Sequence, residues 1–196
     1  MSKRVRRVPL TLDSGDIKDL PEAEIIVILR AADDIVGQGG RSLLVKVLKG
    51  SRDKKVLEHD LDKSPAYGMY KSLSQEAVGH RVDWLIEHNY LRIEYDYRLP
   101  LLYFTDKGWE IERETYSCEM YERFSKAAAD KDTSIIEELR DNTNRQVKNR
   151  VIELIREKCT PDMLPLVEAW AAVEVKKLKA ALNSAAKEIT ARNTDI

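Results

Sequence analysis

The sequence has few of the residues from which catalytic and metal sites are usually built. It contains two cysteines, Cys118 and Cys159, and they do not form a C-x-x-C pair. Its three histidines, His59, His80 and His88, share no spacing that favours a zinc site. We therefore expect reduced, structural cysteines, no metal, no cofactor and no locally assembled nucleophile.

Long apolar runs are also missing. No stretch of about eighteen apolar residues occurs, so the sequence predicts no membrane-spanning helix. The first residues are basic and lack the apolar centre of a secretory signal, so we expect a cytoplasmic protein. Lys3, Arg4, Arg6 and Arg7 are expected to form a flexible basic arm within residues 1–20.

The chain has no nucleotide-binding loop of the ATPase type. The pattern G-x-x-x-x-G-K-[ST] is absent, and the glycine patch at residues 37–40 lacks both its spacing and its lysine. We interpret this patch as a turn that links two helices. The sequence therefore predicts a non-catalytic protein.

The overall charge is close to neutral, but it is unevenly distributed. The 196 residues carry a net charge of −1, with 43% apolar and 34% charged residues, as expected for a soluble globular protein. Residues 37–81 hold nine Lys/Arg against five Asp/Glu, whereas residues 82–133 hold seven against twelve. Any anion-binding surface must therefore come from local asymmetry.

Apolar periodicity and turn residues predict a winged helix in the first half of the chain. Pro21 suits the first turn of one helix, Gly50 ends a second, and Ser74 starts a third. The predicted elements are helices over about residues 21–35, 42–49 and 74–88, and strands over residues 91–95 and 101–105 around a turn at 96–100. Three helices followed by a β-hairpin describe a winged helix, a variant of the helix-turn-helix.

The rest of the chain is predicted to be helical. A helix over residues 106–126 is followed by a linker at residues 127–131. The segment around residues 141–155 looks like one HEAT-type helical unit, whose second apolar face needs a neighbour. That neighbour is either the preceding domain or, for a homodimer or a protein complex, another chain. We predict a mainly α fold, with a winged helix at residues 21–113 and a C-terminal helical, HEAT-like module at residues 114–196.

The segment Val47–Lys55 carries the strongest chemical signal. A glycine turn, a small hydroxyl and four cationic side chains stand together at the predicted end of the second helix. This combination suits a nucleic-acid phosphate, because glycine frees the backbone and the cations displace counterions. The alternative is an ordinary solvated charged face. A second polar segment, Lys71–Ser74, precedes the third helix, whose N-terminal N–H groups favour phosphate.

Several short motifs occur in an order that is typical of one family. In chain order they are Val47-Leu48-Lys49-Gly50-Ser51, Lys55-Val56, His59-Asp60, Tyr67-Gly68, Leu85-Ile86, Tyr90-Leu91 and Phe104-Thr105-Asp106-Lys107-Gly108. On these residues, the segment from about Ile25 to Gly108 resembles the RQC domain, the winged helix that follows the motor in RecQ-type DNA helicases. Because no motor is present, the chain is similar to the stand-alone bacterial RQC-minor proteins. The resemblance implies a DNA-binding protein connected with DNA repair or recombination.

The resemblance also implies which residues contact DNA. For two phosphate clamps it implies Lys49, Ser51, Arg52, Lys54, Lys55, Lys71, Ser72 and Ser74, and for the wing it implies Tyr95, Tyr97 and Arg98. Tyr97 is the better candidate for stacking on a terminal base pair, and Tyr95 is the second. Both tyrosines fit equally well a role in covering the hairpin.

Two other interpretations of the function remain open. His80 and Arg81, expected to be exposed on the third helix, would read bases if the protein were a sequence-specific transcription regulator. The winged helix could instead be a protein-interaction module that uses its acidic and apolar faces. The favoured prediction is binding of duplex, forked or junction DNA through phosphates, with an affinity that falls steeply with salt.

Overall fold

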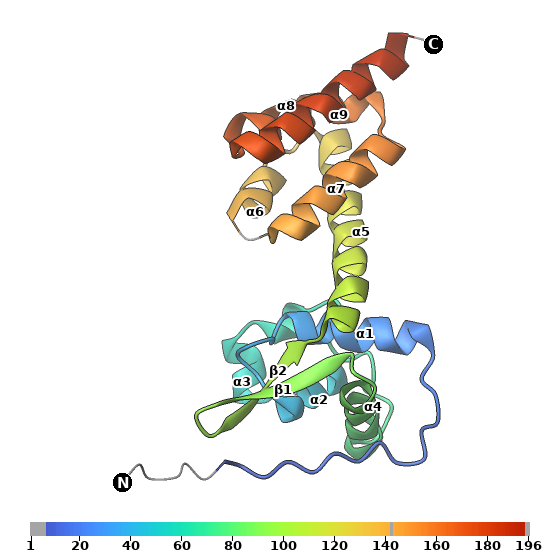
Figure 1. The fold of residues 1–196 in the computed structure, drawn as a ribbon, viewed down its shortest axis with the longest axis vertical. Coiled ribbons are helices and arrows are strands. Elements are labelled where there is room, and N and C mark those ends of the chain that lie inside the picture. The colour runs from blue at the N-terminus through green and yellow to red at the C-terminus, as the bar shows by residue number, and fades with distance from the viewer. Residues whose placement is uncertain (1–6, 142, 195–196) are drawn as a thin grey trace. The chain divides into compact units, whose positions relative to one another are not determined.

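The computed structural model describes residues 7–141 and 143–194, and the chain divides after Glu112 into two compact units (Figure 1). The elements of the first unit are α1 (Glu22–Asp33), α2 (Arg41–Lys49), α3 (Lys54–Glu58), the 3-10 turn η1 (Leu61–Lys63), α4 (Gln75–Glu87), β1 (Leu91–Asp96) and β2 (Leu99–Phe104). The next helix, α5 (Asp106–Asp130), begins in this unit and continues into the second. The predicted mainly α fold with a winged helix is confirmed.

The three predicted helices of the winged unit correspond to α1, α2 and α4. Helix α1 follows Pro21 and has two glutamates in its first turn, where carboxylates meet the positive end of the helix dipole. Helix α2 ends at Gly50, whose φ of 68° lies in the left-handed region. Helix α4 follows Ser74, whose hydroxyl accepts a hydrogen bond from the Ala77 N–H (3.0 Å).

The structure adds one helix that the sequence analysis did not predict. Helix α3 has five residues, too few for an apolar period to be recognised. Asp53 caps it by accepting from the Lys55 N–H (3.0 Å), and it also pairs with Lys46 (2.8 Å). The hydrogen bond from Lys46, together with that from the Lys55 amide, holds the pKa of Asp53 below its usual value. The cationic residues after Gly50 therefore belong to an ordered turn and helix.

The β-hairpin is longer than predicted and its turn is shorter. Strands β1 and β2 pair antiparallel along their full length, and only Tyr97 and Arg98 connect them. The predicted turn at residues 96–100 is therefore too long. Pro100 favours a loop in the sequence because it lacks an N–H, yet it stands opposite Tyr95 in the ladder.

One apolar core joins the helices of the winged unit to the base of the hairpin. Its fully buried members include Ile28, Leu29, Leu44, Leu48, Val78, Val82, Leu85, Leu91 and Leu102. Burial of each large aliphatic side chain contributes roughly 1.5–3 kcal/mol. The glycine patch borders this core: the Gly37 N–H donates to the Leu102 carbonyl, and the Leu102 N–H donates to that of Gly39 (both 2.9 Å).

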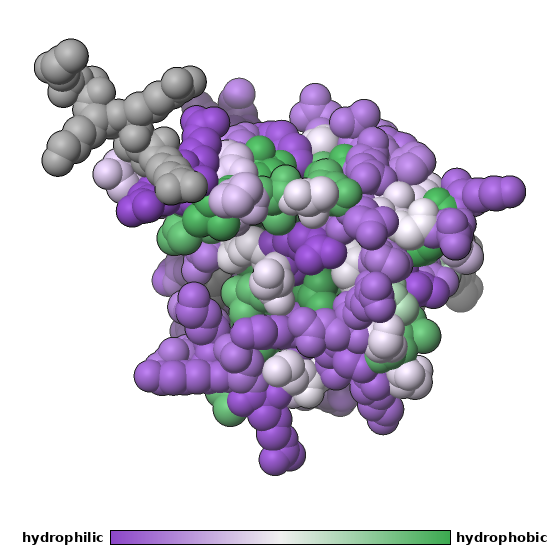
Figure 2. Space-filling view, turned by 90° about the horizontal axis from the view of Figure 1, so that it is seen from below, coloured by the Kyte–Doolittle hydropathy of each residue, from purple (hydrophilic) through white to green (hydrophobic). Residues whose placement is uncertain are grey.

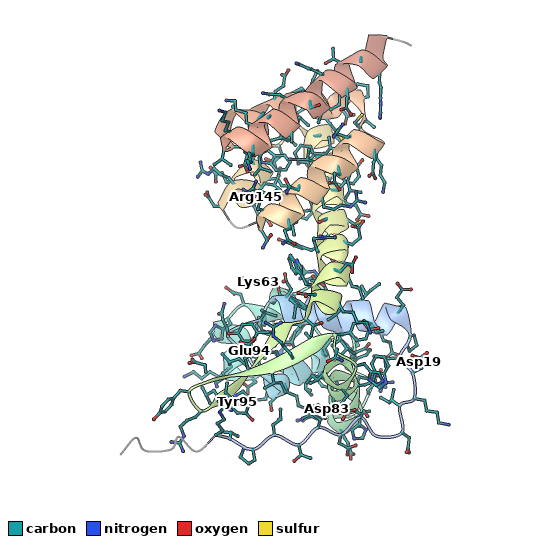
Figure 3. The ribbon with its side chains drawn as sticks, viewed as in Figure 1. Asp19, Lys63, Asp83, Glu94, Tyr95 and Arg145 are labelled. Carbon is teal, nitrogen blue, oxygen red and sulfur yellow. The ribbon has the colours of Figure 1, made fainter. Side chains whose placement is uncertain are left out.

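Residues 7–20 form an extended segment, which we call the N-terminal strap (Figures 1 and 3). It is bonded to the wing, because the Val8 N–H donates to the Arg98 carbonyl (3.3 Å). It is also bonded to α4, because the Asp13 N–H donates to the Asp83 carboxylate (2.9 Å). The strap therefore runs from the hairpin turn along α4 to the start of α1.

The strap includes part of the predicted basic arm. Lys3, Arg4 and Arg6 lie outside the described residues. Arg7 is described, and its guanidinium lies 4.8 Å from the centre of the Tyr95 ring. Viewed from the strap side, the molecule shows small groups of apolar side chains between hydrophilic ones (Figure 2).

The second unit is entirely helical in its described part. Beyond α5 it consists of α6 (Ile135–Asp141), α7 (Arg145–Lys158), the 3-10 turn η2 (Pro161–Met163), α8 (Leu164–Val173) and α9 (Lys176–Thr194). Its core holds Met120, Phe124, Leu139, Val151, Ile155, Val167, Trp170 and Leu182. The predicted linker at residues 127–131 is wrong for most of its length, because α5 continues to Asp130 and buries Ala127 and Ala128.

Candidate nucleic-acid interface

The turn after α2 packs directly against the turn before α4. A Cβ atom on Gly50 would lie only 3.0 Å from the Gly68 Cα, so a side chain there would force the two turns apart. The Gly68 N–H donates to the Val47 carbonyl (2.9 Å), and the Tyr67 hydroxyl donates to the Ser51 carbonyl (3.2 Å). Two segments that are separate in the sequence therefore form one surface.

Lys49 completes this junction. Its half-buried ammonium donates to the carbonyl oxygens of Lys71 (2.9 Å) and Leu73. The resemblance implied that Lys49 contacts phosphate. In the structure, its ammonium group instead binds carbonyl oxygens of the backbone. Lys49 thus acts as a brace that holds the segment before α4 beside the end of α2.

Exposed cations lie on the two segments that Lys49 holds together, which follow α2 and precede α4. Arg52, Lys54, Lys55 and Lys71 are all exposed. Lys54 forms an ion pair with Glu58 (3.4 Å), but its side chain is 83% exposed, so the pair is weak. In the described part of the chain, no carboxylate lies within ion-pair distance of Arg52 or Lys71. This surface can therefore neutralise phosphate without first breaking strong internal pairs.

The serines of both segments are arranged around the same turns. The Ser51 hydroxyl accepts from the Asp53 N–H (3.2 Å), and the Ser74 hydroxyl caps α4. A hydroxyl that accepts a hydrogen bond keeps its own proton to donate, so both can still donate to a phosphate oxygen. Ser72, between Lys71 and Leu73, is exposed.

The two tyrosines of the wing differ in their surroundings. Tyr97 lies in the hairpin turn, is 72% exposed, and has a φ of 51°, which is uncommon for a residue other than glycine. The Tyr95 hydroxyl donates to the Val8 carbonyl (3.0 Å), and Arg7 covers its ring, so the strap half-buries it. Arg98 is exposed beside Tyr97. Tyr97 is thus the accessible ring of the pair.

His80 and Arg81 are not exposed, contrary to expectation. His80 Nε2 lies 3.7 Å from the Asp13 carboxylate, and a Cβ atom on Gly15 would meet the His80 ring at 2.6 Å. Arg81 pairs with Glu24 of α1 (2.7 Å). The expectation that both side chains are exposed is wrong, because the strap contacts His80 and α1 contacts Arg81.

A buried ion pair under the strap was missed by the sequence analysis. Arg41, at the start of α2, donates from two nitrogens to Asp83, and the Nη2–Oδ2 distance is 2.7 Å. Asp83 is fully buried, and its carboxylate also accepts the Asp13 N–H. The signal in the sequence was an acidic residue between Val82 and Trp84, on the apolar side of the third helix. Figure 3 shows Asp83 on α4, on the side of the strap.

The residues that the structure describes contain neither a metal-binding cluster nor a membrane-spanning helix. No group of three or more His, Cys, Asp or Glu residues among them could hold a metal ion. No helix among them is long and apolar enough to span a bilayer. Cys118 and Cys159 are both free thiols, and burial raises the pKa of Cys118. We call Gly50–Lys55 and Lys71–Ser74 the braced surface, and they form the candidate site of the winged unit.

One protein family matches the whole segment from α1 to β2. The family model of the RQC domain matches residues 19–129, which is more than half of the 196 residues. The chain belongs to the RQC family. RQC domains are DNA-binding winged helices and are not themselves catalytic. The RQC match begins before α1 and reaches almost to the end of α5.

One curated relative of this RQC protein is an ATP-dependent DNA helicase RecQ from Bacillus subtilis (strain 168). The two are 29% identical over 101 residues, which cover 52% of this chain and 17% of the helicase. The RQC chain therefore spans less than a fifth of the length of that relative. No solved structure matches it at a significant level.

Proposed function

We propose that this RQC protein binds duplex or branched DNA without catalysis, chiefly through backbone phosphates. The observation that carries the proposal is the Lys49 brace, since it holds Lys71–Ser74 beside Gly50–Lys55. One DNA strand would then meet cations and hydroxyls from both segments at once. Affinity from such contacts comes largely from counterion release.

Each part of the surface has a defined task in this proposal. Arg52, Lys55 and Lys71 neutralise phosphates, with Lys54 as a further cation once it leaves Glu58. Ser51, Ser72 and Ser74 donate hydroxyl hydrogen bonds, and the first N–H groups of α4 add a partial positive charge. Lys49 does not touch DNA but keeps the two segments in register. These contacts carry no sequence information, so the binding is indifferent to sequence.

The wing supplies the selectivity for DNA structure. Tyr97 presents an exposed ring at the hairpin turn, with Arg98 beside it. A ring in this position stacks on the terminal base pair of a duplex end or a fork, which contributes roughly 1–3 kcal/mol. Tyr95 stabilises the wing by packing against the strap, and it does not contact bases.

The covered face of α4 argues against the rival function of a sequence-specific regulator. Base reading in the major groove requires free side chains on the recognition helix. His80 is shielded by the strap, and Arg81 is paired with Glu24. His80→Ala should therefore leave DNA affinity within about twofold of wild type, since this side chain reaches no base. A larger loss restricted to one DNA sequence would favour the regulator.

The proposal is tested by titrating labelled duplex, forked and four-way junction DNA of unrelated sequences at two salt concentrations. We expect binding to all sequences, a preference for ends or forks, and a steep loss of affinity with salt. A triple variant, Arg52→Ala with Lys55→Ala and Lys71→Ala, should lower the slope of log K against log[salt] by about three. Absence of binding to every DNA form would refute the proposal and favour the protein-interaction module.

A matched control removes the same number of charges elsewhere on the chain. Lys18, Lys126 and Lys187 are exposed and lie outside the braced surface, so their joint replacement by alanine should leave the salt slope unchanged. If both triple variants lose affinity equally, the binding depends on general charge and the braced surface has no special role.

A further inference from the structure

The helical unit carries a second cationic surface, where the α6–α7 loop meets the turn between α8 and α9. Lys148 of α7 connects the end of α6 to the turn between α8 and α9. Its ammonium donates to the Arg140 carbonyl (2.9 Å) and pairs with Glu174 (2.7 Å). The Val175 N–H in turn donates to the same Glu174 carboxylate (3.2 Å). This buried pair fixes the start of α9 beside the end of α6 and the first turn of α7.

Four exposed cations lie in the first turns of α7 and α9, the two helices whose starts the Lys148–Glu174 pair connects. Lys176, Lys177 and Lys179 lie in the first turn of α9, and Arg145 lies in the first turn of α7, one turn before Lys148. Figure 3 shows Arg145 at the α6–α7 end of the helical unit. We call these four residues the basic corner. Two helix N-termini add their partial positive charges to it.

Two carboxylates beside the basic corner, Glu174 and Asp141, are already engaged. Glu174 is 3% exposed and bound to Lys148, while Asp141 pairs with Arg140 (2.7 Å). No carboxylate among the described residues lies within ion-pair distance of any of the four cations. Several arginines of the unit, in contrast, are paired, as Arg156 is with Glu188. The four cations of the corner therefore keep charges that no ion pair among the described residues neutralises.

Apolar side chains lie within this charged surface. Val173 is 45% exposed and Val175 is 66% exposed, on either side of Glu174. A nucleic-acid backbone offers the matching chemistry, because its phosphates attract the cations and the carbons of its sugars can cover the valines. Two valines are too little apolar surface for stable insertion into a bilayer.

We propose that the basic corner is a second phosphate-binding surface, for the same DNA molecule that the winged unit grips. The inference rests on the proposed function, because four exposed cations alone bind DNA weakly. Once the winged unit holds a DNA molecule, the second contact becomes intramolecular and its effective concentration rises. The helical unit then adds affinity for DNA long enough, or branched enough, to reach both surfaces.

The test compares two double variants of the full chain. Lys176→Ala with Lys177→Ala removes two cations from the corner, and Lys126→Ala with Lys187→Ala removes two exposed cations from elsewhere on the same unit. We expect the corner variant to lower the slope of log K against log[salt] by about two on four-way junction DNA, with the control unchanged. Thermal unfolding of both variants should match that of wild type, since all four side chains are exposed.

The outcomes separate this inference from the function on which it rests. If wild type binds DNA and the corner variant has an unchanged affinity and salt slope, the basic corner does not bind DNA. If wild type binds no DNA at all, the proposed function itself fails. Binding of wild type to anionic lipid vesicles, lost in the corner variant while DNA binding persists, would also overturn the inference and assign the corner to a membrane surface.

Discussion

The Lys49 ammonium lies 2.9 Å from the carbonyl oxygen of Lys71, which is twenty-two positions further along the chain. This contact turns two polar segments into one surface, and it separates the residues that shape the surface from those that bind on it. A lysine that only positions others should affect DNA affinity without contributing to counterion release. That difference can be measured.

Lys49→Met keeps the length of the side chain and removes the donors to the carbonyls before α4. We expect a loss of about 0.5–1.5 kcal/mol in the free energy of unfolding, because the partly exposed carbonyls of Lys71 and Leu73 lose a hydrogen bond that water replaces in part. DNA affinity should fall with an unchanged salt slope. Arg52→Ala should show the opposite pattern, with full stability and a slope lower by about one. A reduced slope for Lys49→Met would mean that Lys49 itself contacts phosphate.

The Gly50–Gly68 contact predicts an asymmetry between two otherwise similar substitutions. Both glycines have φ near 70°, at 68° and 71°, so alanine at either position carries a left-handed backbone cost of about 1–2 kcal/mol. A Cβ atom on Gly50 would also meet the Gly68 Cα at 3.0 Å, whereas a Cβ atom on Gly68 would lie 3.5 Å from the Gly50 Cα. Gly50→Ala should therefore be the more destabilising, and the more damaging to DNA binding, in urea titrations and binding assays. Equal losses would show that only the backbone conformation matters.

Local patterns in the sequence were sufficient for most of the winged unit. The apolar periods predicted α1, α2 and α4, and two runs of strand-forming residues around a turn predicted both strands. Helix α3 was missed because five residues hold no period. The end of α5 was predicted four residues too early, because the alanines at 127–129 were interpreted as a linker. Alanine is also the residue with the highest helix propensity, and here the helix continues through it.

The contacts that define the site could not be predicted in the same way. Lysine offers the same donors to a carbonyl and to a phosphate, so the sequence alone cannot assign Lys49 to one of them. The shielding of His80 depends on Asp13 and Gly15, which are far away in the sequence. The Arg41–Asp83 pair likewise spans forty-two positions. Contacts of this range are set by the tertiary fold, which a single sequence does not display.

The buried Lys148–Glu174 pair makes the stability of the helical unit depend on pH. Burial alone would raise the pKa of Glu174, but hydrogen bonds from Lys148 and Trp170 outweigh it and hold the pKa below its usual value. The carboxylate therefore stabilises the unit above about pH 4.3, the ordinary glutamate pKa, and this contribution is lost as the pH falls through the lower folded pKa.

Glu174→Gln tests this dependence. It should cost about 3 kcal/mol at pH 7, since it leaves a buried ammonium without its partner, and the cost should shrink below about pH 4. The measurement is hydrogen exchange of α8 amides at pH 7 and pH 3.5. Glu168→Gln, an exposed position on the same helix, is the control and should change little at either pH. A cost that stays constant with pH would contradict the role of the carboxylate.

Tyr97 combines exposure with a strained backbone, so its ring and its conformation can be tested separately. Tyr97→Phe keeps the ring and should keep affinity for forked DNA within about twofold. Tyr97→Asn removes the ring but suits a φ of 51°, because asparagine tolerates the left-handed region. We expect it to leave the hairpin intact and to weaken fork binding by roughly 5- to 150-fold, the loss of one stacked base.

The DNA substrate supplies the second control for Tyr97. A duplex closed by loops at both ends offers no exposed terminal base pair, so Tyr97→Asn should bind it as well as wild type does. Equal losses on closed and forked DNA would mean that Tyr97 contacts the backbone or the minor groove. A loss on forked DNA alone would show that the Tyr97 ring acts at duplex ends. The wing would then be the part of the protein that selects the DNA structure.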